Sequence, residues 1–268
     1  MSVKVRFIGA GNIVRAILAG VEKSGVYTPD QIGIFDVSEA VREDFQKQGY
    51  GVYSSIGELV KEAPVVVMAV TPQVIGSIME EVKSTFSTDT VILSVAAGIG
   101  TDWFQKRLGD GCKAVRCMPT LTAQEGMGSF AVSRTANMSE KDFSEVDRFL
   151  SSCGIVEEIP ESLMNEVVAL NGSAPGYFYH MANVIVEEAV KMGFDKITAM
   201  RLFAQTMKGS AETLLNSGMS GELLESKLRL PGGTTLAALD KMDELGFDTC
   251  LQEGVKACVN RCKELSQL

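Results

Sequence analysis

The chain has 268 residues, of which 46% are hydrophobic and 22% charged, which is enough apolar content for one large or two ordinary domains. Its formal net charge of −9 would repel a polyanion, so no nucleic acid is expected as a partner. The longest apolar run, residues 65–70, is too short to cross a bilayer, and strand-like sequence begins at once, which leaves no room for a cleavable signal. We therefore expect a cytoplasmic protein without a membrane partner.

Cysteine and histidine usage argues against a metal centre. The six cysteines include no CxxC pair, and His180 is the single histidine, so no metal site is predicted. His180 has no acidic residue one helical turn away to orient it, which favours packing in a core or an interface over catalysis.

The first predicted element is a strand at residues 3–8, which runs into two close glycines and then into a helical pattern. Gly9 lets the chain turn sharply, and Gly11 lets the backbone N–H groups of Asn12 and Ile13 approach a pyrophosphate at the positive end of the helix. These four residues are the first predicted cofactor-binding group.

The second predicted strand, residues 31–35, ends at Asp36, whose carboxylate could accept hydrogen bonds from a ribose 2′-hydroxyl. Asp36 would repel a 2′-phosphate, although Ser38 and Arg42 could contact one if Asp36 turned away. We therefore expect NADH or NADPH as cofactor, with a preference for NADH. Val14 stands where the full fingerprint has a third small residue, which predicts a helix set further out or re-aimed.

Two nearly apolar strands follow, at residues 65–70 and 90–95, and this composition is typical of strands buried on both faces. Ligands of an open parallel sheet bind beyond the carboxyl ends of its strands. Small residues at these ends leave room for a flat ring and its ribose. The predicted contacts are Ala69, Val70, Thr71 and Pro72 after one strand, and Ala96, Ala97 and Gly98 after the other.

Three further strands are expected at residues 113–118, 129–133 and 155–159, and strand–helix alternation up to residue 160 predicts a doubly wound α/β sheet. The loop after the strand at 113–118 could close one wall of the reaction chamber, and its residues Met118 and Thr120 are predicted to contact the cofactor. After residue 160 the pattern is helical throughout. We expect a dinucleotide-binding domain at residues 1–160 and an all-helical domain at 161–268.

In the helical half, Ser162, Asp195, Ser220 and Thr234-Thr235 are candidate helix caps. The stretch at residues 174–186 is apolar around much of its circumference, which favours dimerisation. A central helix surrounded by its own neighbours is the alternative.

Two loops of this half present small residues and hydroxyls at helix starts, which suits a carboxylate without Arg or Lys. One is Asn171–Pro175, which includes Ser173, and the other is Leu230–Thr235. Ordinary helix breaks would have the same composition.

Taken in order, these motifs resemble the pyrroline-5-carboxylate reductase family over essentially the whole chain. The resemblance is carried by the glycine turn with Asn12, by AVxPQ at 69–73, by SVAAGI at 94–99, by Arg116 with Met118-Pro119, and by PGGTT at 231–235. It implies an N-terminal Rossmann-like domain, a helical domain that forms an interlocked dimer, and NAD(P)H as hydride donor. It also implies that Thr235 hydrogen-bonds the ring nitrogen and that the backbone at Gly233-Thr234 holds the substrate carboxylate.

Several positions depart from the family pattern, four of them at predicted contacts or beside them. Thr71 replaces a lysine, Thr120 an asparagine, Asn171 a serine, and Leu230 the serine before PGG. We expect reduction of 1-pyrroline-5-carboxylate to L-proline, and these departures leave open a paralogue that reduces a different small cyclic imine. A non-catalytic dinucleotide-binding regulatory protein is a further alternative. A β-hydroxyacid dehydrogenase is disfavoured, because residues 162–190 contain no Lys or Arg.

Overall fold

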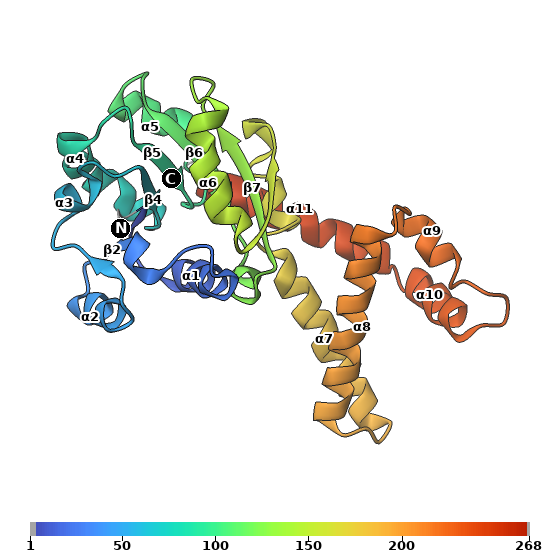
Figure 1. The fold of residues 1–268 in the computed structure, drawn as a ribbon. Helices are drawn as coiled ribbons and strands as arrows, with labels where there is room; N and C mark the ends of the chain where they lie inside the picture. The colour runs from blue at the N-terminus through green and yellow to red at the C-terminus, as the bar shows by residue number, and fades with distance from the viewer. Residues whose placement is uncertain (1–3, 267–268) are drawn as a thin grey trace. The chain divides into compact units, whose positions relative to one another are not determined.

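The structure is a computed structural model that describes residues 4–266 and divides into two compact units (Figure 1). The first unit comprises the chain up to Ala174 together with the segment from Cys258 onward, and the second comprises Pro175–Ala257. The predicted domain boundary follows residue 160, whereas the two units divide after Ala174. The assignment of domains stays a prediction.

An eight-stranded sheet with the order β3-β2-β1-β4-β5-β6-β7-β8 forms the centre of the first unit. All neighbours pair in parallel except β6 and β7, which are antiparallel. The strands are β1 Val5–Ile8, β2 Ile32–Phe35, β3 Gly51–Val52, β4 Val65–Met68, β5 Val91–Ser94, β6 Lys113–Met118, β7 Gly128–Arg134 and β8 Gly154–Glu158. The predicted doubly wound α/β class is confirmed, while β3 and the reversal at β7 were not anticipated.

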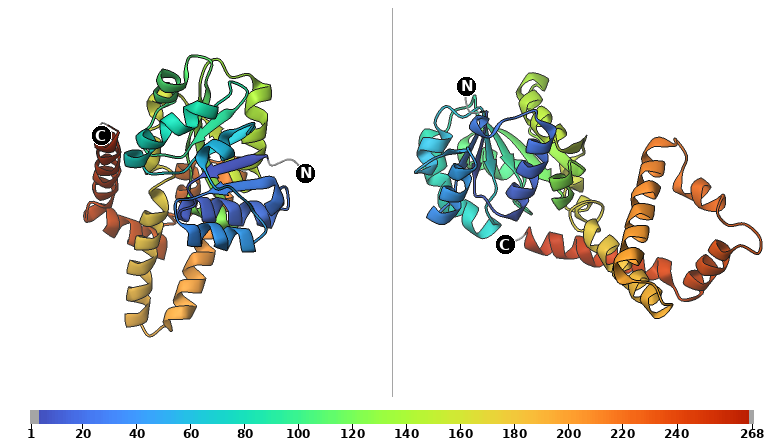
Figure 2. Two further views of the ribbon diagram at one scale, coloured as in Figure 1. Left: turned by 90° about the vertical axis from the view of Figure 1, so that its left-hand side faces the viewer. Right: turned by 60° about the horizontal axis from the view of Figure 1, so that its bottom comes forward.

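Helices cover both faces of this sheet (Figure 2). One face packs against α1 Asn12–Ser24, α2 Glu39–Lys47 and α6 Glu140–Ser151, and the other against α3 Ile56–Val60, α4 Pro72–Thr85 and α5 Thr101–Leu108. Short 3₁₀ segments η1 Pro29–Gln31, η2 Leu121–Glu125, η3 Glu161–Leu163 and η4 Val167–Ala169 connect them. The central strands β4 and β5 therefore alternate their side chains between two buried layers, which explains their unbroken apolar runs.

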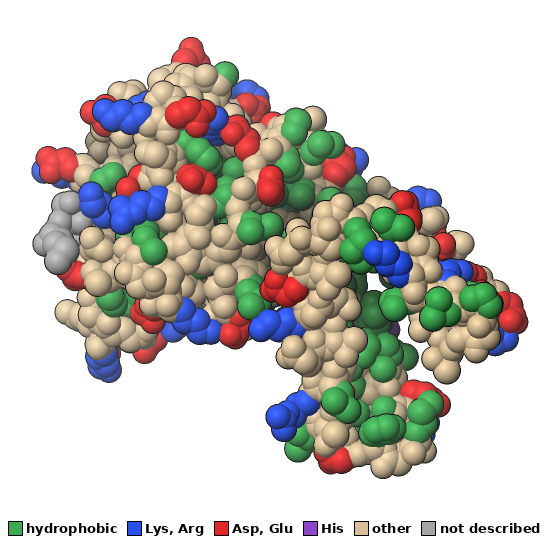
Figure 3. Space-filling model, turned by 45° about the vertical axis from the view of Figure 1, so that its right-hand side comes forward, with side chains coloured by type: hydrophobic (Ala, Val, Ile, Leu, Met, Phe, Trp, Pro, Cys, Tyr) green, Lys and Arg blue, Asp and Glu red, His purple; other side chains and the backbone are tan. Residues whose placement is uncertain are grey.

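Every regular element of the second unit is helical, as predicted. The helices of the C-terminal half are α7 Ala174–Lys191, α8 Lys196–Asn216, α9 Gly221–Ser226, α10 Thr234–Glu244 and α11 Phe247–Leu265, the last of which continues into the first unit. Helices α7 and α8 form an antiparallel hairpin on which hydrophobic side chains gather at the surface (Figures 2 and 3). They include Phe178, Met192, Phe194, Ile197 and Leu202, each more than half exposed.

The predicted caps are correct in part. Asp195 and Ser220 accept backbone N–H groups at the starts of α8 and α9. Ser162 lies inside η3 instead, and Gly233 rather than a threonine is the N-cap of α10. Within residues 4–266, no helix combines the length and apolar character that crossing a membrane requires.

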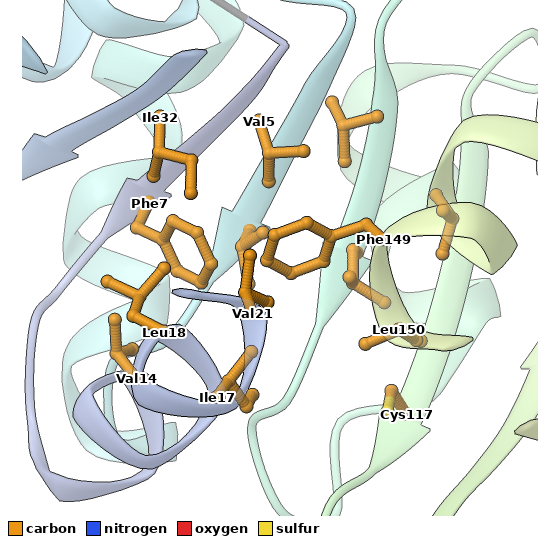
Figure 4. Packing of buried hydrophobic residues seen from close by; sticks show 14 of the residues in the cluster. Val5, Phe7, Val14, Ile17, Leu18, Val21, Ile32, Cys117, Phe149 and Leu150 are labelled. Carbon is orange, nitrogen blue, oxygen red and sulfur yellow. The ribbon is translucent and has the colours of Figure 1, made fainter. Parts of the chain in front are cut away.

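The larger hydrophobic cluster lies between the sheet and α1, α2 and α6 (Figure 4). The rings of Phe7 in β1 and Phe149 in α6 meet with centroids 5.8 Å apart. Val14 and Ile17 of α1 are also buried there, so the valine at the third fingerprint position is a core residue. Because these side chains anchor both β1 and α1, they fix the glycine turn that joins the two elements.

Helix α1 lies very close to η2 at Gly20, in the C-terminal half of the helix. A Cβ on Gly20 would overlap the carbonyl oxygen of Ala123 in η2 and lie 2.7 Å from the Cβ of Cys153. The C-terminal half of α1 therefore packs tightly against η2. The sequence pattern drew attention to Val14 and did not predict this contact at Gly20.

Candidate functional site

The glycine turn after β1 lies directly on the turn after β4. Gly9 adopts φ +94°, and a Cβ there would stand 2.6 Å from the carbonyl oxygen of Ala69 and 3.1 Å from Cγ1 of Val70. The N–H of Gly9 also donates to the carbonyl of Phe35 at 2.8 Å. A side chain at Gly9 would thus push apart the carboxyl ends of β1 and β4.

The first turn of α1 is open to a ligand. Gly11 is the exposed N-cap, no side chain caps the helix, and no acidic residue occupies its first turn. A Cβ on Gly11 would meet no atom within 4 Å, so protein packing does not explain this glycine. The exposed Asn12 and half-buried Ile13 follow it. Uncapped N–H groups at the positive end of a helix suit a phosphate or pyrophosphate.

Asp36 stands at the end of β2 with both carboxylate oxygens engaged. Oδ2 accepts the N–H of Ala10 at 2.9 Å, and Oδ1 accepts the N–H of Ser38 at 2.9 Å. Each carboxylate oxygen has a further lone pair, so Asp36 can still accept from a hydroxyl. The Arg42 guanidinium donates to the carbonyls of Asp36 at 2.5 Å and Val37 at 3.3 Å.

The turn after β4 places the other predicted residues at the same edge of the sheet. Thr71 is the exposed N-cap of α4, its side chain makes no capping bond, and Pro72 is the first helical residue. Ala69 and Val70 are half-buried against the glycine turn. Since β1 and β4 are neighbours, the predicted phosphate turn and the Ala69–Pro72 segment adjoin one another.

The next strand, β5, ends in a turn of small residues. Ala96 is buried, Ala97 is exposed, and Gly98 adopts φ +77°. A Cβ on Gly98 would lie 2.8 Å from the Cα of Ser266, so the end of the described chain packs on this turn. Sequence reasoning did not foresee that contact, because nothing in the local pattern links residue 98 to residue 266.

The loop after β6 is held by hydrogen bonds of its own. The hydroxyl of the buried Thr120 accepts the N–H of Ser129 at 2.9 Å and pairs with the Thr122 hydroxyl at 2.8 Å. Thr120 therefore closes the β6–β7 connection, and its hydroxyl keeps the capacity for one further hydrogen bond. Met118 is half-buried, and its carbonyl accepts the Asn171 amide at 2.9 Å.

Asn171 explains how the chain accommodates one of its departures from the family pattern. It is 5% exposed and, besides its bond to Met118, accepts the N–H of Gly172. The half-buried Ser173 follows, with its N–H donated to the carbonyl of Val168 at 2.8 Å. The amide side chain thus ties the loop before α7 to the end of β6.

The Leu230–Thr235 loop belongs to the second unit and joins α9 to α10. The N–H of Gly233 donates to the carbonyl of Leu230 at 2.8 Å, and Gly232 takes φ +74°. Thr234 and Thr235 are exposed in the first turn of α10, whose N-cap Gly233 offers no side-chain bond. This arrangement leaves N–H groups and two hydroxyls available to an anion.

Arg229, immediately before that loop, was not singled out from the sequence. Its guanidinium lies 2.6 Å from Glu225 in α9 and 3.4 Å from Asp243 in α10, and the hydrogen bond that Arg229 donates to Glu225 raises the Arg229 pKa. Arg229 therefore links the helices on both sides of the loop. His180 is exposed on α7, so it is not a core residue of this chain, and its predicted alternative, an interface, stays a prediction.

Comparison with known proteins adds the following findings. Residues 161–265 match the family model described as pyrroline-5-carboxylate reductase dimerisation, and residues 4–98 match one described as NADP oxidoreductase coenzyme F420-dependent. The chain is 31% identical to the pyrroline-5-carboxylate reductase of Methanosarcina acetivorans over 98% of both chains. It is 33% identical to that of Arabidopsis thaliana, over 99% of this chain and 96% of the relative.

A solved structure shows the same similarity in three dimensions. The Plasmodium falciparum pyrroline carboxylate reductase, crystallised with NADP bound, superposes with a TM-score of 0.88 at 25% identity and with 98% of each chain covered.

Proposed function

Because the chain belongs to the pyrroline-5-carboxylate reductase family, we propose that it reduces 1-pyrroline-5-carboxylate to L-proline with a reduced nicotinamide dinucleotide. The observation that supports this most directly is the uncapped first turn of α1, which Gly11 leaves open at the carboxyl edge of the sheet. This is the kind of edge at which doubly wound sheets bind dinucleotides.

The reaction needs a hydride, a proton and two positioned partners. The nicotinamide supplies the hydride, which adds to the imine carbon, while the ring nitrogen takes a proton and the C=N bond becomes a C–N bond. Protonation of the imine makes its carbon more electrophilic. The chain itself needs to hold both rings close together and aligned, because positioning can contribute much of the rate enhancement.

In this proposal the cofactor lies along the carboxyl edge of the sheet. The pyrophosphate is held by Gly9, Gly11, Asn12 and Ile13, and the adenosine ribose by Asp36. The turns Ala69–Pro72 and Ala96–Gly98, together with Met118, would hold the nicotinamide end of the cofactor. Thr120 contributes through the shape of its loop, because its hydroxyl is engaged within that loop.

The substrate carboxylate and ring nitrogen are assigned to the start of α10, and Ser173 stays a predicted substrate contact. Gly233 and Thr234 hold the carboxylate through backbone N–H groups, since the first turn of α10 has no side-chain cap. Thr235 orients the ring nitrogen by a hydrogen bond. Its hydroxyl is too weak an acid to be the proton donor, so its role is positioning of the protonated imine.

The surroundings of Asp36 support NADH over NADPH. Asp36 keeps a carboxylate at the place where a 2′-phosphate would lie, and like charges repel. Arg42 is directed to the backbone carbonyls of Asp36 and Val37, and the Ser38 hydroxyl accepts the N–H of Val41 as the cap of α2. Arg42 keeps its other N–H groups and Ser38 keeps its hydroxyl proton as possible donors to a 2′-phosphate, so the preference for NADH rests on the charge of Asp36.

Self-association through the helical half is part of the proposal. The family model that matches residues 161–265 is a dimerisation domain, and apolar side chains are exposed on α7 and α8 (Figure 3). A second copy of the chain would remove this surface from water. Light scattering on the purified protein should give at least twice the monomer mass of 28.8 kDa.

Leu230 keeps a second candidate reaction open. Its side chain is 63% exposed next to the proposed carboxylate site, where the family pattern has a serine. A substrate with an apolar substituent near its carboxylate would suit this position better than an unsubstituted ring. The alternative is a paralogue that reduces a larger cyclic imine by the same chemistry.

The test is loss of NAD(P)H absorbance when 1-pyrroline-5-carboxylate is added, compared among wild type, Thr235→Ala and Thr234→Ala. We expect Thr235→Ala to lower kcat/KM by about tenfold or more, the effect of one lost hydrogen bond to a charged group. Thr234→Ala keeps its backbone N–H and should retain most activity. Tight cofactor binding without turnover by the wild type would favour a regulatory protein instead.

A further inference from the structure

Arg116, near the carboxyl end of β6, carries a buried positive charge. Its side chain is 6% exposed, and Nη1 lies 3.0 Å from Oε1 of Glu161. Its Nη2 donates to Oδ1 of Asn165 at 2.6 Å. A buried guanidinium requires such partners, because desolvation strongly disfavours an unpaired charge. Arg116 therefore fastens the segment after Pro160 to the sheet.

Asn165 joins this cluster to the end of α11. Its Oδ1 also accepts the Ser266 hydroxyl at 3.2 Å, and the neighbouring Glu166 pairs with Lys263 at 2.7 Å. A single acceptor oxygen thus serves both a buried guanidinium and the last described turn of the chain. All of these residues belong to the first unit.

The same cluster holds the turn after β5 at two points. At one point Ser266 packs on Gly98, whose added Cβ would lie 2.8 Å from the Ser266 Cα. At the other, Thr101, the first residue of α5, donates to Oε2 of Glu161 at 3.4 Å. Ser266 is linked to Arg116 through Asn165, and Thr101 is linked to Arg116 through Glu161. The turn between β5 and α5 is therefore fixed by groups that no local sequence pattern connects.

We propose that Asn165 is a positioning residue, which joins Arg116 to Ser266 and so fixes the turn Ala96–Gly100 against the nicotinamide end of the cofactor. This inference rests on the proposed function for the identity of the ring at that turn. It predicts an effect confined to one end of the cofactor. Three strand spacings separate β5 from β2, which places Asp36 about 14 Å away along the sheet.

The experiment compares Asn165→Leu with the conservative Asn165→Asp, which keeps an acceptor for both donors. Fluorescence titration gives the Kd of NADH, and competition gives the Kd of ADP-ribose, which lacks the nicotinamide. If the wild type binds NADPH more tightly than NADH, NADPH and 2′-phospho-ADP-ribose are used instead. For Asn165→Leu we expect the dinucleotide Kd to rise about tenfold while the ADP-ribose Kd changes less than about twofold. Asn165→Asp should restore dinucleotide affinity to within about threefold of wild type.

Asn137 supplies the matched control. Its amide donates to the carbonyls of Asp110 and Cys112 before the start of β6, at the opposite end of that strand. Asn137→Leu should lower stability without separating the two Kd values. Equal weakening of both ligands by Asn165→Leu, or weakening of neither, would overturn the proposal.

A second variant and the choice of a binding measurement separate loss of positioning from misfolding and from loss of turnover. If Asn165→Leu does not fold, Ser266→Ala removes the hydroxyl without stranding the guanidinium, and it should raise the dinucleotide Kd about threefold with ADP-ribose unchanged. No change in either Kd for a folded Ser266→Ala would contradict the proposal. The binding readout does not require turnover, so a wild type that binds NADH but leaves pyrroline-5-carboxylate unreduced would refute the proposed function and still test Asn165.

Discussion

The carboxylate of Asp36 accepts the backbone N–H of Ala10 at 2.9 Å, so the acid that ends β2 also braces the middle of the glycine turn. One side chain thus has two tasks, to fix the turn that cradles a pyrophosphate and to present negative charge to the ribose. The two tasks can be separated by substitution, because only the second depends on the charge.

Asp36→Asn removes the charge and keeps one acceptor oxygen for the Ala10 N–H, while the Ser38 N–H loses its acceptor. We expect the ratio of kcat/KM for NADPH to that for NADH to rise about tenfold, since repulsion of the 2′-phosphate is lost. Steady-state kinetics with both cofactors measures the ratio. An unchanged ratio, or a wild type that already prefers NADPH strongly, would remove Asp36 as the determinant.

Gly20→Ala should destabilise the first unit. The added Cβ would overlap the carbonyl oxygen of Ala123, which is backbone and cannot rotate away. Overpacking of this kind costs about 1–3 kcal/mol. Gly76→Ala is the control, because a Cβ at this exposed position in α4 meets no atom within 4 Å and should stabilise the helix by about 0.5–1 kcal/mol. Urea unfolding of both variants checks the opposite signs, and equal signs would contradict the packing described.

Asp142 predicts a pH dependence of stability. The Lys113 ammonium, 2.7 Å from Oδ1, and the Ser139 hydroxyl lower the Asp142 pKa to about 2. The carboxyl of the unfolded chain, whose pKa is about 3.9, binds the proton more tightly, so the stabilisation is complete above about pH 5 and is lost as the pH falls toward 2.

The variant Asp142→Asn lacks this titration. Urea unfolding at several pH values should therefore show the free energy of unfolding of the wild type falling more steeply than that of Asp142→Asn between about pH 4 and pH 2. Parallel curves for the two proteins would mean that the pair with Lys113 does not form in solution.

Arg229→Met tests the link between the helices that flank the Leu230–Thr235 loop. Without the guanidinium, Glu225 and Asp243 no longer hold α9 against α10. Exposed ion pairs stabilise weakly, so we expect KM for the imine to rise about threefold while KM for the cofactor stays the same. Lys256→Met removes an ordinary surface pair with Glu253 in the same unit and should change neither value. A loss confined to cofactor KM would assign Arg229 another role.

Local patterns predict the parts of this protein that are governed by local physics. The apolar runs of β4 and β5, the turn at Gly9 and the cap at Asp195 follow from burial, φ preference and side-chain geometry within a few residues. The two-residue strand β3 is too short to carry a periodic signal. The antiparallel pairing of β7 depends on how its connection runs, which the composition of the strand does not encode.

The residues that the sequence did not reveal are those whose partners lie far along the chain. Gly20 is required by η2, about a hundred positions later, and Asn165 matters because Ser266 and Arg116 meet at its amide. Thr120 was assigned to the cofactor because it replaces a polar residue of the family pattern, yet its hydroxyl is engaged with Ser129 and Thr122. Its role at the cofactor therefore stays a prediction.

Direct hydride transfer from the nicotinamide to the imine carbon of the ring is tested most directly by isotopic labelling. The protein would be given cofactor deuterated at C4 of the dihydronicotinamide together with 1-pyrroline-5-carboxylate, and the product analysed by mass spectrometry and NMR. We predict proline with one deuterium on the ring carbon that was the imine carbon. When the deuterium is the C4 hydrogen that the enzyme transfers, the amount of labelled proline should equal the amount of cofactor oxidised. Proline without deuterium from either face-labelled cofactor, or oxidised cofactor without proline, would contradict the account.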